Sequence, residues 1–384
     1  MPKTMKILIL GNYILDQQKS MQLFSALLEK ELRKSGHDVR LIRPEPFFGK
    51  IGFFGKALSK WLGYLDKFFI FPFVLRRNLL WAEVVHICDH SNAFYTGYLK
   101  SKPHLVTCHD LLAIRSALGE FPENRTHFAG KIFQKLILSG LNNAKRVACV
   151  SETTKSDLLR ISKLEPEKVS VIADALNYPY SVIEKEKVKE YLLRLKLNPD
   201  SQFILHVGGN QWYKNRAGVL EIFKALISFP EFSDTHLIFS GAAWTKQMRL
   251  LIKKYNLKEK VHEIIYPDSN TLCALYSGAK ALVYPSLYEG FGWPIIEAQA
   301  CGCPVFTTNR PPMTETGSDA AVYIEPRNPQ ECASVIRNSL NDENKISAME
   351  KKGFINAQKF STDKMLNAYL AVYKEVINAH TSSY

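Results

Sequence analysis

The stretch Tyr284–Glu297 has the sequence YPSLYEGFGWPIIE and joins a predicted strand to a predicted helix through a loop that contains two glycines. The apolar run Ala281–Tyr284 predicts the strand, and Pro294 is typical of the first turn of a helix. The glycines let backbone amides approach a ligand closely, and the helix N-terminus offers N–H groups that suit a diphosphate. A carboxylate at Glu297, about one turn into the helix, can accept two hydrogen bonds from a cis-diol such as that of ribose. The stretch therefore predicts a nucleotide site.

Strand and helix patterns alternate along the rest of the chain. Apolar runs predict strands at Met5–Leu10, Asp38–Ile42, Ala82–Ile87, His104–Cys108, Arg146–Val150, Val169–Ile172, Phe203–Val207, His236–Ser240, Val261–Ile265 and Pro304–Thr307. Each half of the chain opens with a strand that ends in a glycine turn, which indicates two successive doubly wound α/β domains. We place them at residues 1–178 and 179–361, with a hinge near 177–180 and a final helix from Thr362.

The composition is that of a globular protein, with 384 residues, 46% apolar and 23% charged. The seven cysteines show no CxxC and no Cys/His metal spacing, so we interpret them as reduced core thiols of a cytosolic protein. The sequence shows neither a signal peptide nor an apolar run of about 20 residues. We therefore predict a cytoplasmic protein without a membrane span.

Positive charge concentrates in the first half of the chain. The net charge is +13, and residues 1–178 hold 26 Lys and Arg against 16 Asp and Glu. The segment 47–78 interleaves aromatic and aliphatic residues with six basic residues and a single acid, Asp66. One interpretation is an amphipathic stretch on an anionic membrane surface, which would make the protein peripheral on the inner face of the plasma membrane. The other is a helix pair that packs in the core and leaves its lysines in solvent.

The stretch Leu205–Arg216, with the sequence LHVGGNQWYKNR, forms a second candidate site. The predicted strand ends at Gly208 and Gly209, and Lys214 follows a few residues later. A flexible ammonium group beside a glycine turn is a natural phosphate ligand. Arg216 is a candidate for a second positive charge at the same place.

Polar residues also follow the strands of the first half. His109 and Asp110 come at the end of one strand, and side chains at the carboxyl ends of parallel strands face the crevice above the sheet. Gly11 and Asn12 follow the first strand, and His86 lies at the end of another. We predict that these five residues, with His109 foremost, lie at a site above this edge of the sheet.

The stretch EGFGWPIIEAQACGCPV, which begins at Glu289, resembles the Glu-x7-Glu signature of retaining glycosyltransferases with the GT-B fold, in particular glycosyltransferase family 4 of the group 1 type. The resemblance covers nearly the whole chain and is strongest at 203–325. It implies two Rossmann-like α/β domains that face a central cleft, with the C-terminal helix 362–384 crossing back to complete the first domain. The first domain would bind the acceptor, with Gly11, Asn12, His86 and Asp110 on the acceptor side, and the second would bind the nucleotide sugar.

The resemblance also implies roles for individual residues. In that family the first glutamate lies by the donor sugar and the second holds the ribose, which maps onto Glu289 and Glu297. The backbone of Gly290, Phe291 and Gly292 would face the sugar hydroxyls and the phosphates.

Three further positions complete the implied site. Lys214 would bind the diphosphate and His109 would face the donor sugar, so the resemblance makes His109, Glu289 and Lys214 the catalytic residues. The backbone near Ile264 would contact the base, an arrangement that suits both UDP and GDP.

The chain departs from the family pattern at two positions. Gly209 and Tyr213 stand where a basic residue is often found, which leaves the second phosphate-binding cation, with Arg216 as candidate, an open question. The pair Lys214-Asn215 is common among mannosyl-transferring relatives and favours GDP-mannose as the donor.

Taken together, these observations predict a retaining hexosyltransferase that moves a sugar such as mannose from a UDP-sugar or GDP-sugar to a glycan or a lipid-linked acceptor. The resemblance implies no cofactor and no metal ion. One alternative is a nucleotide-dependent oxidoreductase, but the Gly-x-Gly-x-x-Gly fingerprint is missing after every predicted strand. The other is a nonenzymatic protein that binds a membrane or a nucleic acid through the basic half; we predict no nucleic-acid partner. The oligomeric state cannot be read from the sequence.

Overall fold

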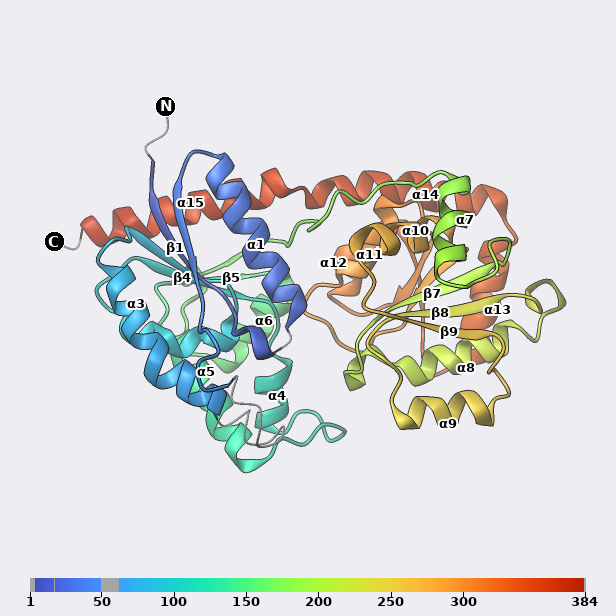
Figure 1. Cartoon of the computed structure of the whole chain (residues 1–384), viewed down its shortest axis with the longest axis horizontal. Coiled ribbons are helices and arrows are strands. Elements are labelled where there is room, and N and C mark those ends of the chain that lie inside the picture. The colour runs from blue at the N-terminus through green and yellow to red at the C-terminus, as the bar shows by residue number, and fades with distance from the viewer. Residues whose placement is uncertain (1–3, 17, 50–61, 383–384) are drawn as a thin grey trace. The chain divides into compact units, whose positions relative to one another are not determined.

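The computed structural model describes residues 4–16, 18–49 and 62–382. The chain divides into two compact units, which Figure 1 shows with the chain coloured from blue to red. Unit 1 comprises Met1–Asn177 and Thr362–Tyr384, and unit 2 comprises Tyr178–Ser361. The sequence placed the first boundary one residue later and the start of the final helix at the same residue, Thr362.

Unit 1 contains a six-stranded sheet with the order β2-β1-β3-β4-β5-β6, in which every neighbouring pair is parallel. Its strands are β1 (Lys6–Leu10), β2 (Asp38–Ile42), β3 (Val84–Ile87), β4 (His104–Cys108), β5 (Arg146–Cys149) and β6 (Val169–Val171). Every residue of the central strands β3 and β4 is buried. Burial on both faces is typical of parallel strands and explains why these runs are apolar without alternation.

The helices of unit 1 include one from the far end of the chain. They are α1 (Lys19–Lys34), α3 (Phe71–Leu79), α4 (Leu112–Leu118), α5 (Phe128–Asn142), α6 (Glu152–Ile161) and α15 (Thr362–Thr381), with shorter turns at η1 (Ile14–Asp16), η3 (Asp66–Ile70, a π-helix), η4 (His90–Tyr98) and η5 (Pro166–Lys168). Helix α15 packs on α1, β3 and β4, and its Tyr369 and Tyr373 are fully buried. The C-terminal helix therefore completes the core of unit 1, as the family resemblance implied.

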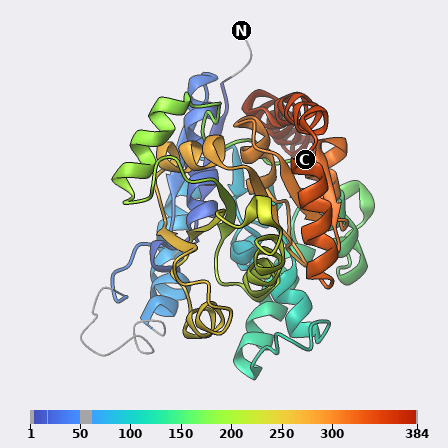
Figure 2. The same ribbon diagram turned by 90° about the vertical axis from the view of Figure 1, so that its right-hand side faces the viewer.

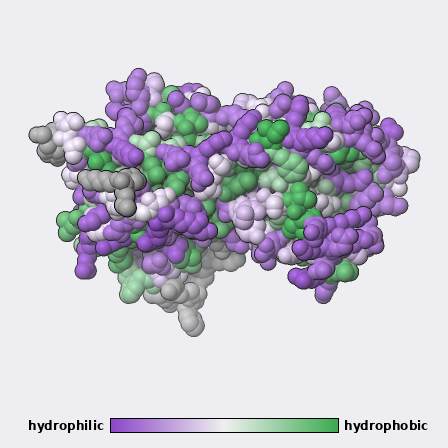
Figure 3. Space-filling view, turned by 90° about the horizontal axis from the view of Figure 1, so that it is seen from above, coloured by the Kyte–Doolittle hydropathy of each residue, from purple (hydrophilic) through white to green (hydrophobic). Residues whose placement is uncertain are grey.

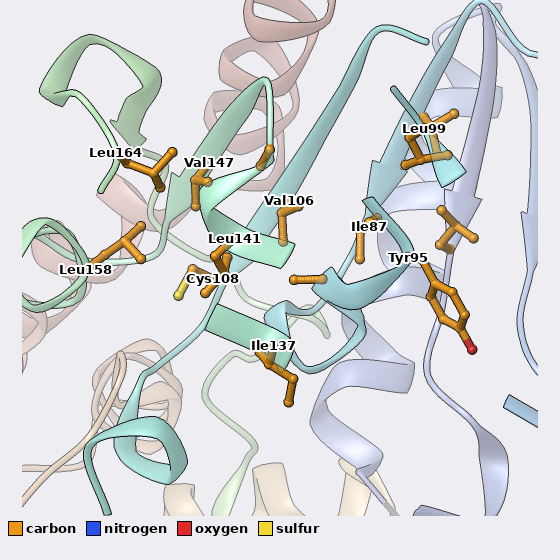
Figure 4. Close-up of a cluster of buried hydrophobic side chains, with 14 of the residues drawn as sticks. Ile87, Tyr95, Leu99, Val106, Cys108, Ile137, Leu141, Val147, Leu158 and Leu164 are labelled. Carbon is orange, nitrogen blue, oxygen red and sulfur yellow. The ribbon is translucent and has the colours of Figure 1, made fainter. Parts of the chain in front are cut away.

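One face of the unit 1 sheet packs on α5 and η4. Figure 4 shows this core, in which Val106 and Cys108 of β4 lie near Ile137 and Leu141 of α5. The close approach depends on Gly140, because a Cβ atom there would lie 2.2 Å from the carbonyl oxygen of Ala93. Helix α5 therefore rests directly on the backbone of η4.

Replacing Gly140 with alanine is expected to lower the free energy of unfolding by about 1–3 kcal/mol, because the added methyl group forces the two backbones apart. Urea unfolding followed by circular dichroism measures this. Gly97→Ala is the matched control, since a Cβ at that position of η4 has no atom within 4 Å. Equal stability of the two variants would contradict the packing described here.

Unit 2 contains a second parallel six-stranded sheet with the order β12-β11-β10-β7-β8-β9. Its strands are β7 (Phe203–Gly208), β8 (His236–Gly241), β9 (Val261–Ile265), β10 (Ala281–Tyr284), β11 (Val305–Thr308) and β12 (Ala321–Ile324). Figure 2, in which unit 2 faces the viewer, shows helices on both faces of this sheet. The arrangement is doubly wound, as predicted.

The helices of unit 2 alternate with its strands along the chain and continue after the last strand. They are α7 (Lys185–Arg194), α8 (Arg216–Leu226), α9 (Lys246–Lys254), α10 (Ser269–Gly278), α11 (Trp293–Ala300), α12 (Met313–Gly317), α13 (Pro329–Leu340) and α14 (Glu343–Ala357), with turns at η6 (Trp212–Lys214), η7 (Pro230–Phe232), η8 (Ser318–Ala320) and η9 (Gln358–Phe360).

The predicted strands all occur, most of them within a residue or two of the expected bounds. The sequence missed the edge strand β12, whose four residues are mostly half-buried and form a short, weak apolar run. Within the part of the chain that the structure describes, no helix combines the length and apolarity needed to cross a membrane. All seven cysteines are free and buried, as predicted.

Candidate functional site

The glycine loop 285–292 connects β10 to α11, as the sequence predicted. Gly292 ends it with a φ of +105°, in the left-handed region that favours glycine. Pro294 lies in the first turn of α11. The N-cap residue of α11 is Gly292, which has no side chain to bond the first amides, and a helix N-terminus suits an anionic ligand.

The turn before α8 is fastened to the glycine loop. Asn215 adopts a left-handed φ of 53°, and its side-chain Nδ2 donates a hydrogen bond of 3.2 Å to the carbonyl oxygen of Pro285. The amide of Leu287 donates a hydrogen bond of 2.7 Å to the carbonyl oxygen of Tyr213. These two bonds hold the two stretches that the sequence singled out against each other.

Three side chains meet where the two stretches join. Lys214 Nζ lies 2.7 Å and 2.9 Å from the two carboxylate oxygens of Glu289, and it donates a 2.7 Å hydrogen bond to Tyr284 Oη. Tyr284 Oη in turn donates a 2.5 Å hydrogen bond to Glu289. The side chains of Glu289 and Lys214 are only 7% and 16% exposed, so little solvent screens the pair. Burial and the Glu289 carboxylate hold the pKa of Tyr284 well above its usual value, which keeps its hydroxyl protonated as a donor.

Glu297 lies in α11 beside two tyrosine hydroxyls. Tyr276 Oη on α10 donates a 2.8 Å hydrogen bond to Glu297 Oε2, and the Tyr180 hydroxyl also favours the carboxylate form. Burial raises the pKa of Glu297 to about 7, against the opposing effects of both tyrosines and of Lys214. The carboxyl group therefore changes charge near neutral pH, an unusual property for a glutamate and one that is frequent at functional sites.

Arg216, the candidate second cation, is 5% exposed at the start of α8. Its Nη1 donates hydrogen bonds to Asn210 Oδ1 and, at 2.9 Å, to the carbonyl oxygen of Ala242, and the guanidinium lies 4.9 Å from the centre of the Phe239 ring. Its Nε and Nη2 are buried and have no hydrogen-bond partner among the described residues. Arg216 forms no ion pair with a described carboxylate, so its buried charge is available to a nearby anion.

The remaining candidates of unit 2 contribute backbone rather than side chains. Gly208 ends β7, and a Cβ atom at Gly209 would meet only the flexible side chain of Gln211, so the backbone does not require glycine there. Phe291 is 6% exposed and packs against Phe360, with the ring centres 5.5 Å apart. Ile264 is half-buried near the end of β9.

In unit 1, Asn12 joins a buried cluster at the carboxyl ends of β1 and β3. Its Nδ2 donates a 2.5 Å hydrogen bond to Asp89 Oδ2, which also accepts one of 2.6 Å from Ser91 Oγ. His90 Nδ1 lies 3.0 Å from Asp89 Oδ1. Burial disfavours the charged forms of Asp89 and His90, but each charge stabilises the other. The pKa of Asp89 is therefore lowered and that of His90 is raised.

His109 is buried in the same region with both ring nitrogens engaged. Nδ1 lies 3.3 Å from Asp174 Oδ2, and Nε2 lies 2.9 Å from the carbonyl oxygen of Cys88. Burial disfavours the charged ring, but Asp174 and Asp89 raise the pKa of His109 to about 9. The imidazole is therefore protonated at neutral pH and acts here as a fixed positive charge.

The prediction that His86 lines an acceptor side is wrong. The side chain is fully buried, with Nδ1 2.7 Å from Tyr373 Oη and Nε2 2.7 Å from Thr107 Oγ1. Burial lowers its pKa to about 3, so the ring is neutral. His86 anchors α15 to the sheet instead. The neighbouring candidate Asp110 caps the start of α4 through a 2.9 Å hydrogen bond from the Leu112 amide, and Gly11 is buried beside Leu41.

Comparison with known proteins connects both units to one enzyme family. The model of the family described as Glycosyl transferases group 1 matches residues 188–355, and the model of Glycosyltransferase Family 4 matches residues 24–177. The chain is a family 4, group 1 glycosyltransferase. Together the two matches cover most of both units and include every candidate residue of unit 2.

Curated relatives of this glycosyltransferase include two O-antigen enzymes. It is 26% identical over 304 residues to O-antigen chain mannosyltransferase B of Escherichia coli, which covers 76% of this chain and 77% of the relative. It is 29% identical over 218 residues to O-antigen chain mannosyltransferase RfbU of Salmonella typhimurium strain LT2, which covers 55% of this chain and 56% of the relative.

Solved structures with the same fold are more distant in sequence. Sucrose-phosphate synthase from Thermosynechococcus elongatus superimposes with a TM-score of 0.75 at 18% identity and covers 98% of this chain and 100% of its own. Anabaena HepE in complex with UDP and glucose gives a TM-score of 0.72 at 16% identity, covering 97% and 100%. These structures confirm the GT-B fold of the glycosyltransferase.

Sequence reasoning missed several contacts of this glycosyltransferase. Tyr284, Tyr276 and Tyr180 each contact one of the two signature glutamates, but no role was assigned to them. Tyr284 could have been found, because it is the last residue of a strand whose carboxyl end leads into the glycine loop. Within the described ranges no group of three His, Cys, Asp or Glu side chains forms a metal-binding cluster.

Proposed function

We propose that this glycosyltransferase moves a hexose, and specifically mannose, from a nucleoside-diphosphate sugar to a glycan or a lipid-linked acceptor with retention of the anomeric configuration and without a bound metal ion. The observation that carries the proposal is the contact of Lys214 with Glu289 and Tyr284 beside the N-terminus of α11. A cation and a carboxylate, both poorly exposed and beside a helix N-terminus, suit a sugar joined to a diphosphate. The names of the O-antigen relatives support mannose and, with it, GDP.

In this proposal each group has one task. The acceptor hydroxyl oxygen forms a bond to the anomeric carbon while the bond from that carbon to the diphosphate oxygen breaks. The hydroxyl proton passes to the departing diphosphate on the same face of the sugar. Lys214, the amides of α11 and, less directly, the buried charge of Arg216 offset the negative charge that builds there, and Glu297 holds the ribose.

Unit 1 supplies the acceptor side in the same proposal. Asn12 and Asp89 present an amide and a carboxylate that are typical partners of sugar hydroxyls, and the protonated His109 provides a fixed positive charge. We place the enzyme in the cytoplasm, at the inner face of the membrane where a lipid-linked acceptor is presented. A nonenzymatic binding protein would not need the Lys214 site and is not favoured.

A thermal-shift panel of UDP, GDP, UDP-glucose and GDP-mannose tests the donor. GDP-mannose is expected to give the largest rise in melting temperature. A ligand at a hundred times its Kd stabilises the folded state by about 2.7 kcal/mol. Equal shifts from UDP and GDP ligands would contradict the choice of base. The absence of any shift across the panel would contradict the donor site itself.

A further inference from the structure

A stripe of large apolar side chains is exposed along the helix that runs from residue 62 into α3. Phe69 is 64% exposed, Phe73 66% and Leu80 89%. Phe69 and Phe73 are four residues apart and share one side of the helix, while the buried residues Phe71, Leu75 and Leu79 occupy the other. The exposed stripe therefore has no role in the core of unit 1.

A second stripe lies on α5, outside the segment 47–78 that the sequence singled out. Phe128 is 80% exposed, Ile132 54% and Leu136 43%, again at intervals of four residues. The opposite side of α5 carries Ile137 and Leu141, which are buried against the sheet.

The two stripes belong to neighbouring helices. Rings at Tyr64 and Phe68 contact the ring of Phe133 on α5, with centres 5.9 Å and 6.2 Å apart. Figure 1 shows α3 and α5 at the same lower edge of unit 1. Figure 3, which looks at the molecule from above, shows by contrast a face that is mostly hydrophilic, with apolar side chains in small separate groups.

The charges around these stripes are almost all positive. Residues 62–82 and 127–145 contain the exposed Arg76, Arg77, Lys131, Lys135 and Lys145, together with Lys67, which is mostly buried and paired with Asp16. Their single acidic residue is Asp66, which is 1% exposed. Asp66 accepts hydrogen bonds from Tyr13 Oη and from two backbone amides, so it contributes no acidic group to the surface.

We propose that the exposed stripes of the 62–80 helix and of α5 form one docking surface for an anionic lipid bilayer. Exposed phenylalanines flanked by lysine and arginine match an interface where apolar side chains enter the acyl boundary and basic groups meet anionic headgroups. A second copy of this chain is a poorer occupant, because the same face would bring basic residues against basic residues. This inference depends on the proposed function in one respect: a bilayer on this surface would bring a lipid-linked acceptor within reach of the enzyme.

The proposal revises the sequence hypothesis about residues 47–78. Part of that segment is core, since Phe71, Pro72 and Leu75 are buried, and residues 50–61 lie outside the described part of the chain. The membrane-facing residues are instead shared between part of the segment and α5, which no sequence pattern had connected.

Flotation of the full chain with vesicles tests the surface. Binding to vesicles of phosphatidylcholine with phosphatidylglycerol is expected to exceed binding to pure phosphatidylcholine by about tenfold or more, and to fall with added salt. The double variant Phe69→Glu with Ile132→Glu is expected to lose at least tenfold in binding, because it removes one apolar anchor from each helix and adds two negative charges. Leu250→Glu, at a 59% exposed position of unit 2, is the matched control and should bind as the wild type does.

Separate measurements keep this test independent of the donor site. The double variant should retain the donor-induced thermal shift, which shows that it is folded and that unit 2 is intact. Equal wild-type binding to neutral and anionic vesicles would overturn the proposal, as would unchanged binding of the double variant. A change from dimer to monomer in the double variant, without vesicle binding by the wild type, would overturn it in favour of self-association.

Discussion

Replacing Lys214 with alanine is expected to lower kcat/KM for sugar transfer about a hundredfold to a thousandfold while the protein remains folded. The ammonium group lies 2.7 Å from both Glu289 Oε1 and Tyr284 Oη, and it is the cation closest to the glycine loop in the described structure. Charge on the departing diphosphate would build in a poorly solvated place, where the loss of one fixed cation is costly. Initial rates with the donor identified by thermal shift measure the effect.

Two variants separate this role from a structural one. Lys224→Ala removes an exposed lysine from α8 and should leave the rate unchanged. Lys214→Ala with Glu289→Gln removes the ion pair without leaving an unpaired carboxylate. If Lys214 served only to neutralise Glu289, the double variant would be as active as Glu289→Gln alone; we expect it to fall well below that single variant.

Replacing Glu297 with alanine is expected to raise the donor KM about tenfold to a hundredfold, because each hydrogen bond to a charged group contributes about 1.5–3 kcal/mol. The effect should depend on pH in the wild type. The pKa of about 7 implies that the carboxylate, which in the proposed site accepts the ribose hydrogen bonds, predominates only above neutral pH. Donor affinity should therefore increase as the pH rises through 7, and Glu297→Gln should abolish that increase.

The same pKa affects the stability of the free protein in the opposite direction. The folded-state pKa of Glu297 is raised above its ordinary value of 4.5, so the folded protein binds this proton more tightly than the unfolded chain does. The resulting stabilisation is fully present below pH 4.5 and is lost as the pH rises through about 7. Glu221→Gln is a suitable control, because Glu221 also accepts a tyrosine hydrogen bond, at 3.1 Å from Tyr255, but on the surface. An identical pH profile for both glutamine variants would contradict the assignment.

Local patterns in the sequence predicted the parts of this structure that depend on local physics. The strand ends, the left-handed Gly292 and the N-terminus of α11 follow from backbone rules that act over a few residues, and they place the glycine loop correctly. The family signature at Glu289 then supplied the fold and the enzyme class, both of which the comparisons confirm.

Contacts between distant segments could not be predicted in the same way. The structural role of His86 depends on its hydrogen bond with Tyr373, which lies 287 residues further along the chain. The raised pKa of Glu297 results from its burial in the folded unit 2, which Tyr276, Tyr180 and Lys214 only partly offset. The stripe on α5 could be interpreted only once the fold placed Phe133 of that helix beside Phe68. The roles of Lys214, Glu289 and Glu297 in transfer stay predictions until the variants are measured.

The position of α15 has a consequence for how the protein is made. Tyr369 and Tyr373 fill the core of unit 1 and bond to Thr107 and His86, yet they leave the ribosome after the whole of unit 2. During synthesis the sheet of unit 1 remains uncovered where α15 will pack, while unit 2 can fold as soon as its own residues emerge. Unit 2 of the nascent enzyme can therefore be complete before unit 1, although unit 1 is begun first, because the core of unit 1 needs α15.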